Sequence, residues 1–588
     1  MQGGSGEGER EELPNLPLTQ PTVPHAGGLM SSTKMVDQLN KPGMNRVRAL
    51  IKAMGYDAED LRRPRIGVHN TWSETSPGHI HLKSVTEAVK AGIWQAGGTP
   101  VEFGGFAQCP VDVGSGGMRY DTPTRDVIAA EVETCAQIHN FEGLVLISSC
   151  DKNVPGHLLA AARLDLPAVI VPGGPMLSGR FQGKDVIITD LDAETWACGV
   201  GRPRLAADDL EELEHAVCPT SGSCALLGTA NTMQCLTEAV GLALPGSATP
   251  PAPTAQRLWI AKQSGRRIVD LVRTGLRPSR ILTPDALENM IVVLHAIGGS
   301  TNAVLHILAL AQEMDLGDRI TLETISRLSE EIDCIVDVRP SGVHTMQDFD
   351  EAGGIPAVMR RLDSRLHLDC LTVSGHSLRE ALAGSRVRRE EVIRPLNRPV
   401  FRGGLAILRG SLATSAVVRP TVVPEQMQAH RGPARVFDSM EDCLAGLEAG
   451  RVRAGEVVVL RYEGPRGGPG LTEVFKVIGY LNALGLNTSC ALVTDGKISG
   501  FAKGPFICQV SPEAALGGPI ALVRDGDPIV VDIPRRRLDL EVSLQELDAR
   551  RTVWRRPTPR VPKGLLSLYA RLAEPPERGG GLPVRFDG

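Results

Sequence analysis

Three adjacent side chains of different chemistry, Cys150, Asp151 and Lys152, follow an apolar run at residues 143–147. The run has the length and the β-branched content of a buried strand, and an alanine-rich segment typical of a helix comes soon afterwards. Open α/β sheets place their ligands at the carboxyl ends of such strands. A thiolate suits a soft metal and a carboxylate a hard one, so the stretch could bind either kind. The alternative is a buried cysteine beside an Asp–Lys surface pair.

A second pair of cysteines stands in the glycine-containing stretch Cys218-Pro-Thr-Ser-Gly-Ser-Cys224. The residues after it, 225–244, have the apolar spacing of a helix, so we predict that the stretch opens a long helix. A helix N-terminus lowers the pKa of a nearby thiol and favours the thiolate that binds metals. The alternative is a buried cysteine at the start of a helix.

Two further loops could present polar groups to a site. Residues 463–473 place Glu463 and Glu473 around a loop that is too rich in glycine to be helical, and one of them could ligate a hard cation. Ser499 lies between flexible residues in the segment TDGKISG, directly after a predicted strand. The alternatives are a solvated turn for the first loop and an ordinary turn serine for the second.

Composition limits the classes of protein that need to be considered. The chain has 588 residues, of which 42% are hydrophobic and 22% charged, so we expect more than one globular domain. The net charge of −5 gives no reason to expect nucleic acid or membrane binding. Neither an 18-residue apolar run nor a secretory signal is present, which predicts a cytoplasmic protein. The 12 cysteines form no CxxC pair, which favours free thiols over a disulfide framework.

We predict an α/β protein with two domains. Residues 1–40 have the composition of a disordered leader. Residues 41–384 alternate strands with helices over short links, which implies a parallel sheet, and become mostly helical from 218 to 380. Residues 385–575 read as a β-rich, barrel-like domain, followed by a tail at 576–588. The predicted strands of this second domain include 405–408, 456–462, 490–494, 519–524 and 528–533, and Asp525-Gly526 predicts a hairpin between the last two.

Together these stretches resemble the IlvD/Edd dehydratase family, from about residue 42 to about residue 573. The matching blocks include IGVHNTWSE, GIWQAGGTPVEF, GMRYDTPTRDVIAAEVE, CDKNVPGHLLAAARLDLPAVIVPGGPM, HAIGGSTNAVLHILALA, EGPRGGPG and VTDGKISG. CDKNVPG followed by AAARLDLP is more similar to the branch that acts on dihydroxy acids of branched-chain amino-acid biosynthesis. GIWQAGG also occurs in the sugar-acid branch, so a sugar acid is the alternative substrate.

The resemblance implies a mechanism and its cofactors. The substrate would be a 2,3-dihydroxy carboxylate, and a [2Fe–2S] cluster held by three cysteines would act as Lewis acid on the C3 hydroxyl. Mg²⁺ would bind the substrate carboxylate and the C2 hydroxyl, while a serine removes the C2 proton. The product would be a 2-keto acid. The resemblance also suggests a homodimer or homotetramer, with active sites near the subunit interfaces.

The resemblance assigns roles to six residues of this chain. Cys150 and Cys224 match cluster ligands, Asp151 and Glu473 match Mg²⁺ ligands, Lys152 matches a lysine that is carboxylated in some members, and Ser499 matches the base.

The chain also departs from the family pattern at three places. Gly78 replaces the first cluster cysteine, Gln509 stands where a histidine is common, and the loop that usually offers an acidic Mg²⁺ ligand is rewritten as residues 104–114. Within that loop Cys109 could take over the role lost at Gly78, and Asp112 is a weaker candidate for the metal. The alternative is a non-catalytic paralogue that keeps the fold for assembly or regulation.

Overall fold

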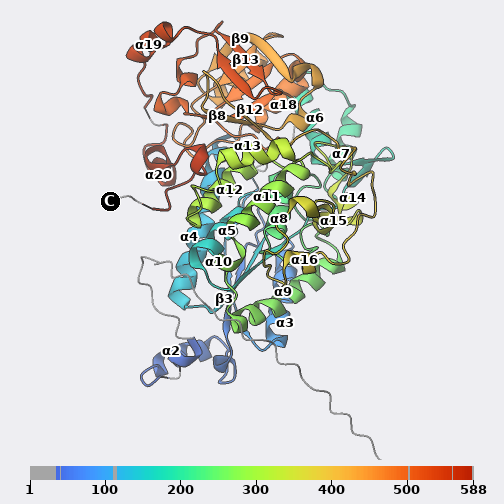
Figure 1. Ribbon diagram of the computed structural model, residues 1–588, viewed down its shortest axis with the longest axis vertical. Coiled ribbons are helices and arrows are strands. Elements are labelled where there is room, and N and C mark those ends of the chain that lie inside the picture. Colours follow the sequence, from blue (N-terminus) through green and yellow to red (C-terminus); the bar gives the residue numbers. More distant parts are fainter. Residues whose placement is uncertain (1–34, 40, 110–114, 501–502, 559, 586–588) are drawn as a thin grey trace, which may run out of the picture.

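The computed structural model describes residues 35–39, 41–109, 115–500, 503–558 and 560–585 (Figure 1). Asp112, residues 1–34 of the predicted leader and residues 586–588 of the predicted tail lie outside the described residues. The chain folds into an N-terminal part that occupies the lower two thirds of Figure 1 and a C-terminal part, in orange and red, above it.

Within these ranges the N-terminal domain is built on a four-stranded parallel sheet. Its strands are β1 (Arg65–Asn70), β2 (Thr99–Gly104), β3 (Gly143–Ser148) and β4 (Ala168–Pro172). They lie in the order β2-β1-β3-β4, each parallel to its neighbours. Every residue of β3 is buried, which explains why its sequence is a continuous apolar run. The predicted parallel sheet is confirmed.

Helices cover this sheet and continue into the helical part of the domain. The helices of the N-terminal domain are α1 (Met35–Leu39), α2 (Asn45–Ala53), α3 (Leu82–Gln95), α4 (Asp121–His139), α5 (Asn153–Leu164), α6 (Ile188–Gly199), α7 (Ala207–Ala216), α8 (Thr229–Ala239), α9 (Ala255–Thr274), α10 (Pro278–Ile281), α11 (Pro284–Ala296), α12 (Asn302–Glu313), α13 (Leu322–Glu331), α14 (Met346–Glu351), α15 (Gly354–Arg361) and α16 (Leu378–Ala381). A small hairpin, β5 (Gly179–Phe181) and β6 (Lys184–Val186), precedes α6.

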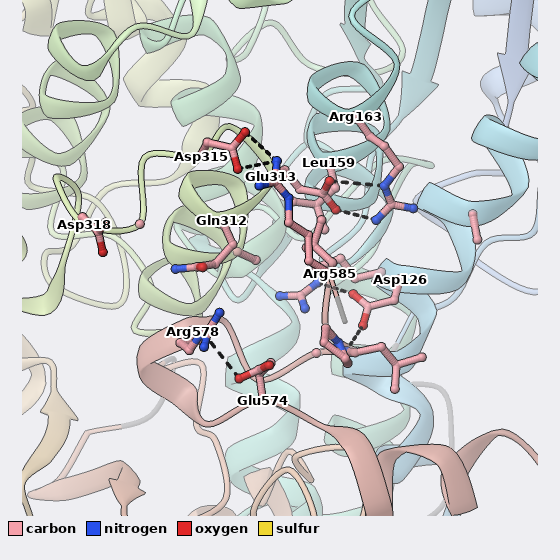
Figure 2. A pocket seen from close by; sticks show the side chains of 18 residues that line it. Asp126, Leu159, Arg163, Gln312, Glu313, Asp315, Asp318, Glu574, Arg578 and Arg585 are labelled. Atoms are coloured by element: carbon pink, nitrogen blue, oxygen red, sulfur yellow. Dashed lines mark hydrogen bonds and ion pairs between the residues drawn. The ribbon is translucent and has the colours of Figure 1, made fainter. Parts of the chain in front are cut away.

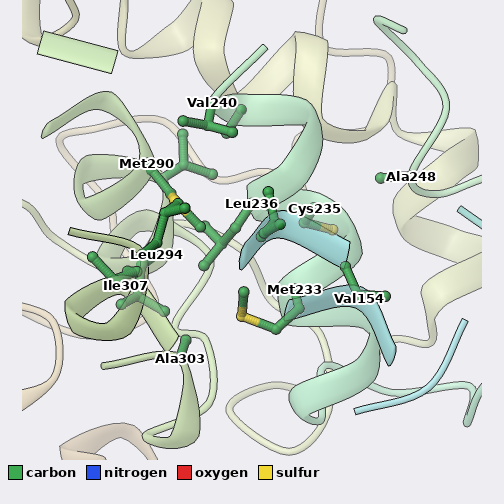
Figure 3. Packing of buried hydrophobic residues seen from close by; sticks show 14 of the residues in the cluster. Val154, Met233, Cys235, Leu236, Val240, Ala248, Met290, Leu294, Ala303 and Ile307 are labelled. Atoms are coloured by element: carbon green, nitrogen blue, oxygen red, sulfur yellow. The ribbon is translucent and has the colours of Figure 1, made fainter. Parts of the chain in front are cut away.

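The middle of this domain is an apolar core shared by α8, α11 and α12. Figure 3 shows Met233 and Leu236 of α8, Leu294 of α11 and Ile307 of α12 packed together, and all four side chains are completely buried. Because these helices are buried on most sides, packing fixes their positions.

The bounds of one predicted helix need correction, and the structure adds detail at both ends of the chain. The helix predicted over 225–244 is shorter, α8 at Thr229–Ala239, so Cys224 lies in an irregular loop before the helix and not in its first turn. Part of the predicted leader is ordered, because Leu39 of α1 is buried against Ile51. The predicted tail is also held in place, since the carbonyl of Gly579 accepts a hydrogen bond of 2.9 Å from the buried Arg125 guanidinium.

The C-terminal domain is a mixed sheet that nearly closes into a barrel, as predicted. Its described strands are β7 (Ala406–Leu408), β8 (Ser415–Val418), β9 (Ala429–Phe437), β10 (Val457–Leu460), β11 (Ala491–Thr494), β12 (Phe506–Ser511), β13 (Pro528–Asp532) and β14 (Arg537–Leu540), in the order β14-β13-β9-β10-β11-β12-β8-β7. A bridge between Arg409, after β7, and Arg537 of β14 joins the two edges. The helices are α17 (Met440–Glu448), α18 (Phe475–Ala483), α19 (Leu544–Val553) and α20 (Leu565–Leu572).

One predicted strand of this domain is wrong. Residues 519–524 contain a 3₁₀ turn at Pro519–Leu522, and Asp525 and Gly526 link that turn to β13, so the predicted hairpin does not form. Proline suits the first position of such a turn, and Ile520 packs into the core of the barrel. The Asp525 carboxylate accepts a hydrogen bond of 2.7 Å from the Val436 N–H, which fixes the link against β9.

A cavity of about 550 Å³ lies where the C-terminal segment crosses α4, α5 and α12 (Figure 2). Its charged side chains pair with one another: Arg163 with Glu313, Arg578 with Glu574, and Arg585 with Asp315. The Arg585–Asp315 pair ties the C-terminal segment to the N-terminal domain. No helix in the described ranges is long and apolar enough to cross a membrane.

Candidate active site

The predicted site residues meet where the two domains touch. Cys150, Asp151 and Lys152 occupy the loop between β3 and α5, at the carboxyl end of the N-terminal sheet. Glu473 precedes α18 and Ser499 follows β11, so the C-terminal domain supplies the other half of the site. Open α/β sheets bind ligands at this edge.

One half of the site, here called the carboxylate end, consists of Asp121, Lys152, Glu473 and Lys497. Lys497 bridges two carboxylates, with its Nζ in contact with Asp121 Oδ2 and 2.9 Å from Glu473 Oε2. Lys152 Nζ lies 3.2 Å from the same oxygen of Asp121. At most 5% of the surface of any of the four residues is exposed. Such burial of charges is tolerated because each carboxylate has an ammonium partner.

These partners set the charge states. Burial alone would raise the pKa of Asp121, but the ammonium groups of Lys152 and Lys497 hold this pKa below its ordinary value. Burial alone would lower the pKa of Lys497, but the Asp121 and Glu473 carboxylates raise it instead. Both groups are therefore charged at neutral pH.

The predicted base, Ser499, is fixed through its backbone. Its N–H donates a hydrogen bond of 2.7 Å to Glu473 Oε1, and its carbonyl accepts one of 2.8 Å from Ser300 Oγ. Thr301 Oγ1 donates to the carbonyl of Ile498. The Asn302 side-chain amide donates to Glu473 Oε2 at 3.0 Å. The GGSTN segment before α12 thus holds both Glu473 and the Ser499 loop in place.

Arg419, which is 1% exposed, joins the Ser499 loop to the loop before α8. One terminal nitrogen lies 3.2 Å from the Gly500 carbonyl and 3.3 Å from the Leu227 carbonyl, and the other donates to Ser341 Oγ at 3.0 Å. Gly500 has a φ of +75°, a conformation that favours glycine. The turn after Ser499 is therefore set by both a glycine and a buried guanidinium.

The other half of the site, here called the thiol end, consists of Cys109, Cys150 and Cys224. The side chains of Cys109 and Cys150 form a hydrogen bond, and Cys109 also lies close enough to Cys224 for its charge to act on that thiol. The Cys150 N–H donates a hydrogen bond of 3.1 Å to His79 Nε2. The structure thus brings the third candidate cysteine together with the two that match the family.

The thiols of Cys150 and Cys224 are protonated at neutral pH. The hydrogen bond with Cys109, followed by burial, raises the pKa of Cys150 well above its ordinary value. Burial, with the charges of Cys109 and Asp151, does the same to the pKa of Cys224. The prediction that a helix N-terminus lowers the pKa of this thiol is wrong, because α8 starts at Thr229 and Cys224 is enclosed in the loop before it.

Gly78 lies directly against the thiol end. A Cβ atom at this position would lie 2.3 Å from Cys150 Sγ, which is closer than two such atoms can approach. The adjacent Pro77 carbonyl accepts a hydrogen bond of 2.9 Å from the Gly222 N–H, so the loops of residues 78 and 224 lie side by side. The position that lacks the family cysteine is thus part of the same cluster of loops.

Asp151 lies between the two ends. Burial raises the pKa of Asp151 to about 6; Lys152 opposes this rise, while the charges of Asp121 and Glu473 add to it. Its charge also acts on Cys150 and Cys224. Asp151 is therefore ionised at neutral pH and within electrostatic reach of both halves of the site.

Sequence reasoning missed four residues of this arrangement: Asp121, Asn302, Arg419 and Lys497. Lys497 stands in the same TDGKISG segment as Ser499, and Asp121 stands in the conspicuous GMRYDTPTRD block, so both were within recognised motifs. The contact between Asp121 and Lys497 could not be predicted from either motif, because it depends on how the domains dock.

Other candidates have structural roles. Glu463 is completely buried, and its carboxylate accepts hydrogen bonds of 2.9 Å from the Met440 N–H and from Arg560. Gln509 supports the GGSTN segment, with its amide donating to the Thr301 carbonyl at 3.1 Å. Cys218 is exposed, unlike Cys224.

The polar atoms of the carboxylate end that lack partners indicate whether a divalent cation fits there. Asp121 Oδ1 is buried and has no hydrogen-bond partner among the described residues, and beyond its ion pair the same holds for Lys152 Nζ. An unpaired buried carboxylate oxygen is the kind of donor that Mg²⁺ uses. Within the described part of the chain, however, no three His, Cys, Asp or Glu side chains already surround one point. Cation binding therefore requires these side chains to adjust.

The class of protein is defined by the two domains and the site between them. An α/β domain with a parallel sheet is joined to a barrel-like domain, and carboxylates and thiols lie at the junction. Two family models match the chain, "Dihydroxy-acid/6-phosphogluconate dehydratase N-terminal" over residues 63–381 and the corresponding C-terminal model over residues 391–580. The chain belongs to this family. Members related to dihydroxy-acid dehydratase generally use an iron–sulfur cluster and Mg²⁺.

Individual relatives cover nearly the whole chain. Dihydroxy-acid dehydratase of Ignicoccus hospitalis is 48% identical over 554 residues, which is 93% of this chain and 100% of the relative. The enzymes of the same name from Acetivibrio thermocellus and Methanothrix thermoacetophila are 46% and 48% identical, over 92% and 93% of this chain and 98% and 100% of their own lengths.

Proposed function

We propose that this chain is a hydro-lyase that converts a 2,3-dihydroxy carboxylate to a 2-keto acid in branched-chain amino-acid biosynthesis. One observation carries the proposal: Ser499 is held by Glu473 next to a buried group of carboxylates, and three thiols adjoin that group through Asp151. The relatives named dihydroxy-acid dehydratase support the choice of substrate.

Cys109, Cys150 and Cys224 would hold a [2Fe–2S] cluster. Cys109 lies within reach of both other thiols, and three such thiols suit a cluster that keeps one iron free of protein ligands. When bound, this cluster supplies a Lewis acid for the hydroxyl that leaves from C3. The chain's part is to bring the three thiols together in one cluster of loops, where Cys150 is buried.

Asp151 and Glu473 would hold Mg²⁺, for which Asp112 and Lys152 remain further candidates. Carboxylate oxygens are the ligands that Mg²⁺ prefers. Glu473 Oε1 accepts one hydrogen bond, from the Ser499 N–H, and so keeps a lone pair for a cation. The cation would orient the substrate carboxylate and the C2 hydroxyl.

The residues of this chain move the proton. Ser499 takes the proton from C2, and its alkoxide is stabilised by the positive charges nearby, among them the Lys497 ammonium. Asn302 and Ser300 keep Glu473 and Ser499 in one orientation through their hydrogen bonds. Burial of the whole group excludes bulk water, which strengthens each of these interactions.

A substrate panel tests the proposal. Protein reconstituted anaerobically with iron, sulfide and Mg²⁺ is incubated with branched 2,3-dihydroxy acids and with aldonates, and keto-acid formation is measured. We expect the branched dihydroxy acids to react fastest. Faster reaction of an aldonate would favour the sugar-acid alternative, and protein that takes up no iron and forms no keto acid would favour the non-catalytic one. Sizing the same protein by light scattering tests the expected homodimer or homotetramer.

A further inference from the structure

A smaller cavity, of about 190 Å³, lies on the C-terminal domain. Its walls come from the loop after β10, the end of β9 and the segment that joins α19 to α20 along the left side of this domain in Figure 1. Three arginines line it, Arg466, Arg556 and Arg560, and Asp438 is the carboxylate among its described lining residues. No residue of the carboxylate end or the thiol end belongs to this lining, so the cavity is separate from the candidate active site.

Two of the three guanidinium groups have no carboxylate partner. Arg560 is paired with Glu463 at 2.9 Å, and Asp438 is paired with an arginine that does not line the cavity. Within the described part of the chain, no ion pair joins Arg466 or Arg556 to an acidic side chain. The cavity therefore presents two positive charges that the protein does not compensate by direct contact.

The end of α20 orients both of these side chains. Arg466 Nε donates a hydrogen bond of 2.8 Å to the Ala573 carbonyl, and Arg556 Nη2 donates one of 2.9 Å to the Ala570 carbonyl. A guanidinium has five N–H donors, so each group keeps four that have no acceptor among the described residues. Because the two groups are held in advance, a ligand that accepts hydrogen bonds from them has less side-chain freedom to remove.

Glu513 lies near Arg466 but does not cancel its charge. The Glu513 carboxyl accepts hydrogen bonds of 3.0 Å from the Arg466 N–H and 2.8 Å from the Gly467 N–H, which fixes the backbone of this wall. Burial raises the pKa of Glu513 to about 7, so the group is partly protonated at neutral pH. A partly protonated carboxyl attracts a guanidinium less than a full carboxylate does.

Tyr462 adds a neutral donor to the same wall. It lines the cavity although only 8% of its surface is exposed. Its hydroxyl oxygen accepts a hydrogen bond of 3.2 Å from the indole N–H of Trp554, and its own proton has no acceptor among the described residues. Tyr462 also has a φ of +65°, a conformation that is uncommon for a bulky residue and that occurs often at ligand sites.

We propose that this cavity, here called the arginine pocket, binds a phosphate group, either as inorganic phosphate or as the end of a small phosphate ester. Arg466 and Arg556 supply two positive charges, and a phosphate group carries nearly two negative charges at neutral pH. Guanidinium groups bind phosphate oxygens through paired hydrogen bonds, and the Tyr462 hydroxyl can serve a further oxygen. The volume is below that of pockets for drug-sized ligands, which suits a compact anion.

An occupied arginine pocket would also stabilise the loop that leads to Glu473. Arg466 lies within this loop, and the Glu463 carbonyl at its start accepts a hydrogen bond of 2.8 Å from the N–H of Thr472 near its end. A phosphate group that contacts both Arg466 and Arg556 would link the loop to the segment between α19 and α20. Because such a ligand binds the folded state, it should raise the temperature of unfolding.

Calorimetric titration of the full-length, reconstituted and desalted protein with inorganic phosphate tests the proposal. At constant ionic strength we expect saturable binding with a Kd of about 1 mM or below, and no binding of chloride. Arg466→Met and Arg556→Met should each weaken binding at least about tenfold, because charged hydrogen bonds are lost, and Tyr462→Phe should weaken it about threefold. Arg555→Met is the matched control, since Arg555 contacts backbone carbonyls and does not line the pocket.

Titration with glycerol phosphate distinguishes the two forms of the ligand. Tighter binding of the ester would assign the pocket to a phosphate ester, and tighter binding of inorganic phosphate would assign it to the free anion. Arg556→Met decides the test if Arg466→Met does not fold, because Arg556 is exposed. The proposal is wrong if no saturable binding occurs up to about 10 mM phosphate, if Arg556→Met binds like the wild type, or if Arg555→Met loses as much affinity.

Discussion

The carboxylate end and the thiol end of the site are prepared for ligands to different degrees. At the carboxylate end, Glu473 accepts hydrogen bonds from Lys497, Asn302 and the Ser499 N–H, so its orientation is fixed in the structure described. At the thiol end, the Cys150 side chain interacts with Cys109 and lies 3.7 Å from Ser76 Oγ, and no ammonium group holds it in the described structure. The first end is charged and internally compensated, whereas the Cys150 and Cys224 thiols of the second are protonated.

This difference has a chemical consequence. Thiols bind iron as thiolates, so each protonated cysteine must lose a proton when a cluster is assembled. The ammonium groups at the carboxylate end already balance its charge. A cation that enters there therefore competes with the Lys497 ammonium, and not with protons, for the carboxylate oxygens. Cluster loading should therefore depend on pH above neutrality. Cation binding should depend instead on the ion pairs of the carboxylate end.

The largest effect on turnover is expected from replacing Ser499, the predicted base. Ser499→Ala should lower kcat by at least about 10²-fold, because a positioned base is lost. Iron content and the binding of Mn²⁺, a probe for Mg²⁺, should stay at wild-type values. The control is Ser489→Ala, in the same domain, whose hydroxyl donates to the Leu486 carbonyl. Turnover close to the wild type in Ser499→Ala would remove this serine from the mechanism.

At the thiol end, Cys109→Ser should cost the reconstituted protein most of its iron, because Cys150 and Cys224 alone cannot hold a two-iron cluster. Iron and sulfide assays and the visible absorption spectrum measure this loss. Cys198→Ser, at an exposed position of α6, is the matched control.

A second substitution sharpens this test. Gly78→Cys in the Cys109→Ser background should restore part of the iron, since residue 78 lies directly beside Cys150 and the Cys150 thiol can turn away to make room. Full iron content in Cys109→Ser would show that Cys109 is not a ligand.

Arg419 connects the two ends, since it contacts both the Gly500 carbonyl after Ser499 and the Leu227 carbonyl in the loop after Cys224. Arg419→Met should lower kcat by about tenfold with little change in KM, because the serine loses its support while substrate contacts remain. Arg419→Lys should recover part of kcat, and the exposed Arg402→Met should behave like the wild type. An equal loss in the lysine and methionine variants, with lowered thermal stability, would point to a structural role only.

The smallest expected effect concerns pH and stability. Burial and the neighbouring Asp495 raise the pKa of Glu513 to about 7, and this carboxyl holds the backbone of Arg466 and Gly467 in the loop that leads to Glu473. Because the native state keeps a proton that the unfolded chain releases, the free energy of unfolding should fall as pH rises from about 5 through 7.

Glu513→Gln should reduce the slope of the free energy of unfolding against pH. The reduction should be at most about 1.4 kcal/mol per pH unit, which is the value for one proton. Urea unfolding at several pH values measures the slope. The Cys150 and Cys224 thiols, whose pKa values are raised well above the ordinary value, should contribute nothing over this range. A slope in Glu513→Gln equal to that of the wild type would contradict the assignment.

The sequence was sufficient for the parts that depend on local pattern. The apolar runs of β1, β3 and β4, separated by helices, predicted a parallel sheet, and the position of Cys150 after β3 predicted the edge at which the site lies. Long-range features were not accessible in this way. Lys497 and Asp121 are far apart in the chain, and only the docking of two domains makes them an ion pair.

Two local errors have the same origin. Residues 225–244 have helical spacing throughout, yet the helix is limited to Thr229–Ala239. The loop around Cys224 is held by tertiary hydrogen bonds, such as that from the Leu227 N–H to the Arg339 carbonyl. Residues 519–524 have the composition of a strand, but Pro519 and burial against the barrel favour a 3₁₀ turn. In both places packing outweighed propensity.

The division of the site between the domains has a consequence for how the protein is made. Cys109, Cys150 and Cys224 all belong to the N-terminal domain, whereas Ser499 and Lys497, which help to enclose the site, are synthesised much later. N-terminal domains generally fold first as a chain leaves the ribosome. The three thiols can therefore come together while the face that the barrel will cover is still open to solvent. Iron donated during this interval would meet an accessible pocket, and arrival of the second domain would then seal it.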